Sequence, residues 1–131
     1  MICEKVFIYH FLYNYTYFVT IATNYRYNDT RKIYKKFRQY VYNHDKNSHI
    51  FSVKEYTKNF HGEVRSTDPV QAYYQARGLH YHVLVFTNKR LDYSRVHKKM
   101  PKHSDIRIQL VPKTKKDIKK VLTYMLKNQI T

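Results

Sequence analysis

The segment Gly78-Leu79-His80-Tyr81-His82-Val83-Leu84-Val85-Phe86 decides the fold. Its run from Leu79 to Phe86 is apolar on both faces, so it lacks the alternation of a strand that has one face in solvent. The run therefore predicts a strand in the middle of a sheet. The two histidines lie at one end of this otherwise apolar segment.

Outward from this strand, other segments favour strands as well. Tyr15–Thr23 is β-branched and aromatic, which is typical of a buried strand. Further strands are expected over His49–Thr57 and Ile106–Val111, and Pro112 ends the last one. The N-terminal run Lys5–Tyr13 is expected to form another strand or an arm.

Two segments have helical periodicity, and the basic segment Asn88–Met100 is a third candidate helix. In Asp29–Asn43, Asp29 or Thr30 can cap the start, and the basic residues lie away from the apolar stripe. That stripe consists of Ile33, Phe37, Tyr40 and Val41. Thr114 and Asp117 make a capping-box-like start for a last helix. Its stripe consists of Ile118, Val121, Leu122, Met125 and Leu126.

The order of these elements, β-α-β-β-α-β-α, predicts an α+β fold in which helices pack on an antiparallel sheet. A chain of 131 residues suits one domain, so we expect a single domain over residues 1–131, with residues 1–14 as the extra strand or arm. The segment Lys58–Arg77 is expected to be a long polar connection.

The charge of the chain points to a polyanionic partner. Twenty-five Lys and Arg against nine Asp and Glu give a net charge of +16, and the basic residues are interleaved with many of the 15 tyrosines. This mixture suits phosphate contacts combined with base stacking, so nucleic acid is the expected partner. A solubility device or an anionic membrane surface are the alternatives.

The N-terminal segment and the single cysteine bear on location. Cys3 has no partner for an internal disulfide, which suits a reducing compartment. The apolar N-terminus is interrupted by Glu4, Lys5 and His10 and lacks a cleavage site, so neither a signal peptide nor a membrane span is expected. We expect the protein in the cytoplasm of a host cell. No GxxxxGK[ST] loop occurs in the sequence, so no nucleotide cofactor is expected.

The histidines of the central strand are candidate metal ligands. His80 and His82 are two residues apart, so both side chains leave the same face of the strand. Alternation places Glu55 on the more apolar face of its strand, where a carboxylate needs a partner or a metal. Two structural histidines and a Glu55–lysine ion pair are the alternative interpretation. Glu63 and Asp68 are substitute ligands if the register differs.

Two imidazoles and a carboxylate leave coordination positions open, as a catalytic metal requires. The same set suits non-haem iron oxygenases, but a charge of +16 favours a phosphodiester substrate.

A tyrosine in the last predicted helix is a candidate nucleophile. Tyr124 falls at the edge of the apolar stripe, and Lys120 and Lys127 lie one turn before and after it. Flanking ammonium groups and a nearby metal would favour the phenolate. An ordinary boundary tyrosine is the alternative.

Together, the His80-x-His82 strand, the upstream acidic strand and the Tyr124-x-x-Lys127 helix resemble motifs II and III of HUH replication initiators. Phe18-Val-Thr-Ile-Ala-Thr23 stands where motif I, a hydrophobic strand with a threonine, is expected. The similarity covers about residues 15 to 128, and compact Rep proteins of archaeal rod-shaped viruses are the most similar type.

The resemblance implies a ferredoxin-like or RRM-like sheet, Mg²⁺ or Mn²⁺, and a tyrosine nucleophile. It makes His80 and His82 metal ligands and Glu55 the third ligand, with Gln75 as a neutral alternative. It makes Tyr124 the nucleophile and Lys127 the motif III lysine. Asn128 follows Lys127 where some relatives carry an acid, which is a departure from the plant and animal virus branches.

The activity that this implies is nicking of single-stranded origin DNA, with hairpin DNA as a candidate form. The DNA would lie over the sheet and over basic residues: Lys35, Arg38, Arg77 and Lys120. Attack by Tyr124 would leave a 5′-phosphotyrosine and a free 3′-OH, and a later 3′-OH can reverse the step. With a single tyrosine in the last helix, a complete cycle can require a homodimer.

Three other functions are compatible with the same residues. A single-tyrosine transposase would share the chemistry. A non-catalytic, RRM-like nucleic-acid-binding protein would use the tyrosines as stacking platforms. A metal nuclease that uses water would leave no protein on its product.

Overall fold

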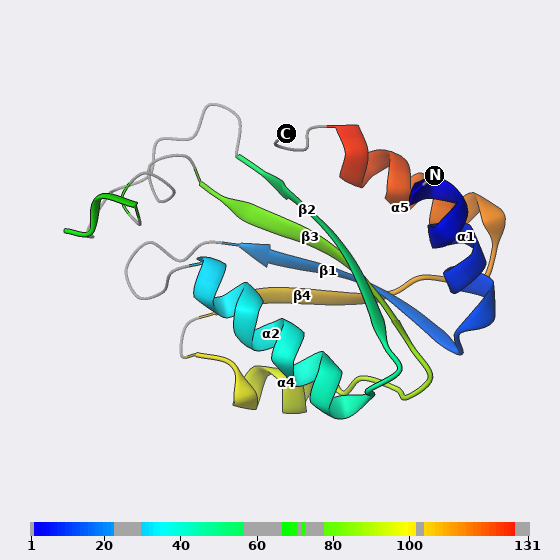
Figure 1. Ribbon diagram of the computed structural model, residues 1–131, viewed down its shortest axis with the longest axis horizontal. Coiled ribbons are helices and arrows are strands. Elements are labelled where there is room, and N and C mark those ends of the chain that lie inside the picture. The colour runs from blue at the N-terminus through cyan, green and yellow to red at the C-terminus, as the bar shows by residue number, and fades with distance from the viewer. Residues whose placement is uncertain are drawn as a thin grey trace.

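A four-stranded antiparallel sheet forms the middle layer of this computed structural model (Figure 1). The structure describes residues 2–22, 30–56, 67–70, 72, 78–101 and 104–127. The strands are β1 (Tyr15–Ala22), β2 (His49–Glu55), β3 (His80–Thr87) and β4 (Asp105–Leu110), in the order β2-β3-β1-β4. The apolar segment around His80 is therefore a central strand, as its sequence predicted.

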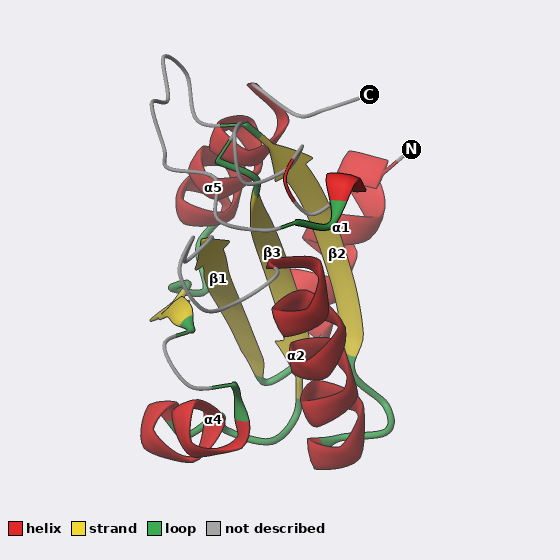
Figure 2. Ribbon diagram, turned by 90° about the vertical axis from the view of Figure 1, so that its left-hand side faces the viewer, coloured by secondary structure: helices red, strands yellow, loops and turns green. Residues whose placement is uncertain are grey.

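Two pairs of helices cover the two faces of the sheet (Figures 1 and 2). Helices α2 (Thr30–His44) and α4 (Tyr93–Lys99) lie on one face, and α1 (Ile2–Leu12) and α5 (Lys115–Lys127) lie on the other. The path β1-α2-β2-β3-α4-β4 with this strand order fits the ferredoxin-like type. The predicted α+β class is confirmed, with α1 and α5 added on the second face.

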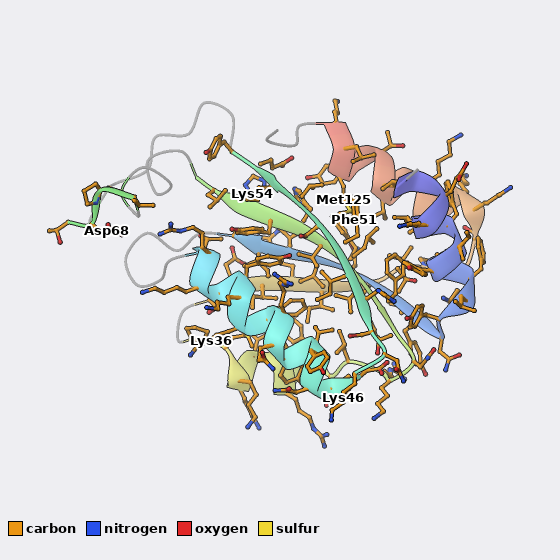
Figure 3. The ribbon with its side chains drawn as sticks, in the orientation of Figure 1. Lys36, Lys46, Phe51, Lys54, Asp68 and Met125 are labelled. Atoms are coloured by element: carbon orange, nitrogen blue, oxygen red, sulfur yellow. The ribbon has the colours of Figure 1, made fainter. Side chains whose placement is uncertain are left out.

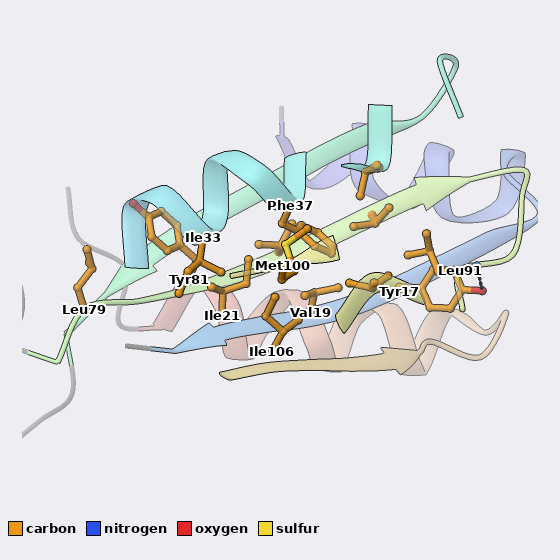
Figure 4. Close-up of a cluster of buried hydrophobic side chains, with 14 residues drawn as sticks. Tyr17, Val19, Ile21, Ile33, Phe37, Leu79, Tyr81, Leu91, Met100 and Ile106 are labelled. Carbon is orange, nitrogen blue, oxygen red and sulfur yellow. Dashed lines mark hydrogen bonds between the residues drawn. The ribbon is translucent and has the colours of Figure 1, made fainter. Parts of the chain in front are cut away.

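Strand alternation sends successive side chains of β1 into two separate cores. On the α2 side, Tyr17, Val19 and Ile21 pack with Ile33 and Phe37 (Figure 4). The predicted stripe of α2 is buried as expected, with Tyr40 only partly covered. The lysines of this helix are on its outer side, as Lys36 illustrates (Figure 3).

The second core lies between the sheet and the α1/α5 pair. Phe18, Leu84 and Phe86 line it from the strands, and Phe51 of β2 and Met125 of α5 also belong to it (both labelled in Figure 3). The start of α5 matches its predicted cap, because the Thr114 hydroxyl oxygen accepts a hydrogen bond from the Asp117 N–H at 3.0 Å. The Thr114 hydroxyl in turn donates to the Asp117 carboxylate.

The prediction for the N-terminus was wrong: residues Ile2–Leu12 form a helix, not a strand or an arm. Its sequence is apolar around most of the helix, so neither a period of 2 nor one of 3.6 stands out. Tertiary contacts decide the conformation. Val6 and His10, one turn apart, are buried against the second core, and the His10 ring joins Thr16 to Pro112 (2.8 and 2.9 Å).

The remaining boundaries differ from the predictions by a few residues. Helix α4 begins at Tyr93, after the N-cap Asp92, and not at Asn88. Residues before it are held instead by Asp45, which accepts hydrogen bonds from the Thr87 hydroxyl and the Asn88 N–H. Most of the predicted connection 58–77 lies outside the described residues. Among the described helices, none is long and apolar enough to span a membrane.

Candidate functional site

The three predicted metal ligands meet at one end of β2 and β3, on the face that α5 covers. The strand register pairs Glu55 with His80 and Val53 with His82, so alternation turns Glu55, His80 and His82 to the same face. The Glu55 Oε1 atom lies 2.6 Å from His80 Nε2 and 2.9 Å from His82 Nε2. Glu55, and not Asp68, is thus beside the histidines; Glu63 lies outside the described residues.

The other nitrogen of each imidazole has its own partner. His80 Nδ1 lies 3.1 Å from the Gly78 carbonyl oxygen, which can only accept, so Nδ1 carries a proton. The positive φ of Gly78, 60°, is easily adopted by glycine at the turn that presents this carbonyl. His82 Nδ1 lies 3.4 Å from Thr20 Oγ1, a longer contact. Both Nε2 atoms therefore face Glu55, while partners at Nδ1 hold the rings.

This arrangement suits a divalent cation. The three ligand atoms lie within 4.8 Å of one another. The Nε2 atoms of His80 and His82 lie within hydrogen-bond distance of Glu55 Oε1, and these same three atoms would hold a divalent cation, which would compete with protons for them. A carboxylate with two imidazoles accepts Mg²⁺ or Mn²⁺ as well as softer metals. The donor set fits the group that the sequence predicted.

The electrostatics of the cluster favour an ionised carboxylate. Burial of Glu55 favours its neutral form, but hydrogen bonds from His82 and His80 outweigh burial and lower the pKa of the carboxyl below its ordinary value. The cluster is largely covered, since His82 is buried and Glu55 and His80 are nearly so. A negative ligand at this place adds to the attraction for a cation.

Tyr124 lies over the same end of the sheet. Its ring centroid is 5.1 Å from that of His82 and 6.1 Å from that of Phe18, edge-on to both. Helix α5 is anchored by buried Leu122 and Met125, which leaves Tyr124 at the margin with 55% of its surface exposed. The predicted nucleophile is therefore beside a predicted metal ligand and open to solvent.

The basic residues of the prediction are divided between two surfaces. Lys120 lines the same groove as Tyr124, and Lys127 is exposed in the last turn of α5. Lys35 and Arg38 belong to α2, on the opposite face of the sheet, where they line a second groove beside β2. Arg77, Gln75 and Asn128 lie outside the described residues. The structure thus brings Lys120, but not Lys35 or Arg38, to the tyrosine.

Two residues near the site, Arg107 and Gln109, had no assigned role in the sequence, and Thr20 had only its place in the motif I segment. Thr20 lies between His82 and Arg107 in the strand pairing, and Gln109 lies opposite Phe18. Arg107 and Gln109 therefore share the site face, two strands from the histidines. The alternation of β4 places them on one face, but the pairing of β4 with β1 could not be read from the sequence.

Comparison with known proteins places the chain in a viral family. It matches the family described as "Virus, 117-like" over residues 12–68 and 61–128. It is 61% identical over 126 residues to "Uncharacterized protein 117" of Sulfolobus islandicus rod-shaped virus 1, covering 96% of this chain and 94% of that protein.

A crystal structure from the same virus, that of the hypothetical protein ORF119, has a similar fold. The TM-score is 0.72 at 58% sequence identity, covering 98% of this chain and 94% of that one. The similarity to proteins of archaeal rod-shaped viruses that the sequence predicted is confirmed. The chain belongs to the virus 117-like family.

Proposed function

We propose that this protein is a metal-dependent single-stranded DNA endonuclease and strand transferase of the single-tyrosine HUH type, which initiates replication. One observation carries the proposal: the exposed Tyr124 ring lies 5.1 Å from the ring of His82, whose Nε2 belongs to the Glu55/His80/His82 cluster. A nucleophile and a cation site on one face are what phosphodiester transfer to a tyrosine requires.

The chemistry assigns a separate task to each residue. Mg²⁺ or Mn²⁺ held by Glu55, His80 and His82 would neutralise charge on the scissile phosphate and orient it. The Tyr124 oxygen attacks phosphorus in line, forming a Tyr–O–P bond while the P–O3′ bond breaks. The phenol loses its proton to solvent and the departing oxygen gains one. Lys120 and Lys127, one turn to either side, hold phosphates of the strand.

The product retains the energy of the broken bond. A 3′-OH that attacks the phosphotyrosine restores a phosphodiester and frees Tyr124, so strands are joined without ATP. Because α5 presents one tyrosine to the cluster, a second cleavage before release calls for a second protomer, and a homodimer is part of the proposal. The viral family favours genome replication over the transposase alternative, whose chemistry is the same.

The test is covalent capture of DNA on denaturing gels. The probe is a 3′-labelled pool of single-stranded hairpin oligonucleotides with randomised loops, incubated with Mn²⁺ or with EDTA. We expect a labelled protein band with Mn²⁺ that EDTA abolishes. Tyr124→Phe removes this band, while Tyr93→Phe retains it. Tyr93 is a matched control, because it is 54% exposed on α4, away from the cluster.

Two results would contradict the proposal. An adduct that survives in Tyr124→Phe would place the nucleophile elsewhere, and cleavage without an adduct would indicate a water-using nuclease.

One observation favours a non-catalytic alternative. In the described geometry the two imidazole Nε2 atoms already lie within hydrogen-bond distance of Glu55. A purely structural cluster would have the same contacts, and the protein would then be an RRM-like single-strand binder. Binding of the same pool with no cleavage in Mn²⁺ or Mg²⁺ would favour this alternative.

A further inference from the structure

A groove between α5 and β4 continues the site face beyond Tyr124. Its volume is about 410 Å³. Its walls come from Phe18 of β1, Gln109 and Leu110 of β4, and Lys120, Val121 and Tyr124 of α5. Pockets of this size accommodate one small molecule or one unit of a polymer. The proposed reaction uses Tyr124 and Lys120 but leaves the rest of the groove without a role.

The groove is connected to the metal cluster through one side chain. The Phe18 ring is roughly parallel to the His82 ring at 5.6 Å, and it meets Tyr124 edge-on at 6.1 Å. In the strand pairing, Phe18 lies opposite Gln109 on its other side. A chain of contacts therefore leads from the cluster past Tyr124 into the groove. A ligand in the groove would therefore lie next to the group that Tyr124 contacts.

The walls suit a planar base. Phe18, Val121, Leu110 and Tyr124 provide apolar and aromatic surface, on which a nucleobase packs regardless of its identity. Gln109 adds one amide, with a donor and an acceptor side by side, which is the type of group that reads the edge of a base.

The charges around the groove indicate how a DNA strand would be oriented, with its phosphates on one side and its base on the other. Lys120 lines the groove, and Arg107 lies two residues from Gln109 on the same strand face. The Arg107 side chain is 82% exposed, and its Nε atom lies 3.8 Å from the Asp105 carboxylate, an exposed pair that leaves the guanidinium open to phosphate. Asp117 also lines the groove, but its carboxylate is engaged by the Thr114 hydroxyl at the helix cap. This negative charge repels phosphate. The backbone is therefore expected near Lys120 and Arg107, with the base turned into the groove.

We propose that this groove takes one unstacked nucleobase of a DNA single strand, next to the nucleotide at Tyr124, and that Gln109 selects which base it is. The inference rests on the proposed function, because that function makes single-stranded DNA the ligand. Gln109 is then a specificity residue that contacts the base, and Lys120 is a phosphate contact that carries no sequence preference.

The test separates base selection from cleavage. A short single-stranded DNA pool, randomised at every position, is selected for binding in EDTA and sequenced. We expect the wild type to enrich one base at one position, and Gln109→Ala to reduce that preference about fivefold or more. Lys120→Ala is expected to weaken binding of all sequences alike and to leave the preference in place.

Gln39→Ala is the matched control. Gln39 is an exposed glutamine on α2, on the opposite face of the sheet, where it donates to Asn43. It is expected to retain the wild-type preference. Circular dichroism and the melting temperature establish that each variant is folded.

The inference is overturned if Gln109→Ala selects the same base as strongly as the wild type, or if the wild type selects none. Failure of the proposed function gives a different pattern, since adduct formation is measured separately with Mn²⁺. If no adduct forms but the base preference depends on Gln109, the nuclease proposal is contradicted and the assignment of the groove to a base is supported. If adducts form but the base preference does not depend on Gln109, the nuclease proposal is supported and the role of the groove is contradicted.

Discussion

At the scale of single residues, the metal cluster depends on which protons its imidazoles carry. His80 donates from Nδ1 to Gly78, which leaves its Nε2 as the atom that faces Glu55 and that would bind a cation. Metal and protons compete for the same atoms. The hydrogen bonds seen without a metal are therefore compatible with a metal-binding cluster and with a purely structural one. Direct measurement of cation binding distinguishes the two.

We predict that Glu55→Gln weakens Mn²⁺ binding at least tenfold, because the cation loses its negative ligand. Titration calorimetry of the wild type and the variant measures the change. Asp68→Asn is the control: Asp68 is exposed and is not one of the three cluster residues, so this variant should bind Mn²⁺ as the wild type does. Equal affinity in Glu55→Gln would exclude Glu55 as a ligand.

A second prediction concerns Asp45, a buried carboxylate that holds two loops. It accepts hydrogen bonds from the Thr87 hydroxyl, the Asn88 N–H and the Asn47 N–H, at 2.8 to 3.0 Å. The Asn88 bond is the largest cause that lowers the pKa of Asp45 below 3.8. We expect Asp45→Asn to reduce the free energy of unfolding by about 1–3 kcal/mol at pH 7.

The pH dependence of that loss follows from the direction of the shift. A lowered carboxyl pKa contributes stability that is present above the unfolded-state value and is lost as the pH falls through the folded-state value. The difference between wild type and Asp45→Asn in urea unfolding should therefore be constant above pH 5 and shrink below pH 3.8. A difference that grows as the pH falls below 3.8 would contradict a carboxylate whose ionised form these bonds stabilise.

Most single residues of the site could be predicted from the sequence. Spacing of two in an apolar strand was enough to place His80 and His82 on one face, and alternation placed Glu55. Arg107 and Gln109 could not be predicted as site residues, because their position depends on which strand β4 pairs with. That pairing is long-range, and no local pattern of residues encodes it.

At the scale of elements, α1 shows where periodicity stops being informative. A clear apolar stripe at helical spacing identified α2 and α5, whereas α1 is apolar on nearly every side. Its outer residues Ile8, Phe11 and Leu12 are exposed although they are apolar. The conformation is settled by contacts with segments about 100 residues away, such as the bond of His10 to the Pro112 carbonyl oxygen.

We predict that His10→Leu detaches α1 from the rest of the fold. The leucine keeps apolar volume but leaves the Thr16 hydroxyl and the Pro112 carbonyl without the imidazole. The free energy of unfolding should fall by about 1–3 kcal/mol at pH 7.5, as measured by urea unfolding. Hydrogen exchange should increase first in residues 2–12.

The same variant tests the protonation of His10. Burial, and then the Lys113 charge, lower the pKa of this imidazole below 6.5. The unfolded chain therefore binds a proton near pH 6.5 that the folded chain resists, and the stability due to His10 falls as the pH drops below that value. The loss caused by His10→Leu should thus be smaller at pH 5 than at pH 7.5. A loss that grows toward pH 5 would contradict a neutral, buried His10.

At the scale of the whole molecule, the charge of +16 is spread over surfaces that face opposite ways. The sequence showed that the lysines of α2 point outward, and this is confirmed. It could not show which face of the sheet α2 covers, since either face satisfies the same amphipathic pattern. Lys35 and Arg38 consequently lie on the α2 face, with the sheet between them and Tyr124.

This separation predicts a dependence on DNA length. A single strand of about six nucleotides seated at Tyr124 contacts Lys120 but does not reach α2. Lys120→Ala should therefore weaken its binding and reduce the slope of log affinity against log salt by about 0.7. The double variant Lys35→Ala/Arg38→Ala should leave the salt slope of this strand unchanged and reduce the salt slope of a longer hairpin, which can pass around the β2 edge to the second groove.

Fluorescence anisotropy over a salt series, with both probes and both variants, measures these slopes. Every basic residue adds to the long-range attraction, so a small uniform loss in both variants is expected from net charge alone. A direct phosphate contact differs, because it changes the salt slope for the probes that reach it and not for the others. If Lys35→Ala/Arg38→Ala reduces the slope for the short strand as much as Lys120→Ala does, the strand binds to the α2 face. The cluster and Tyr124 would then lie on the wrong side of the sheet to act on it.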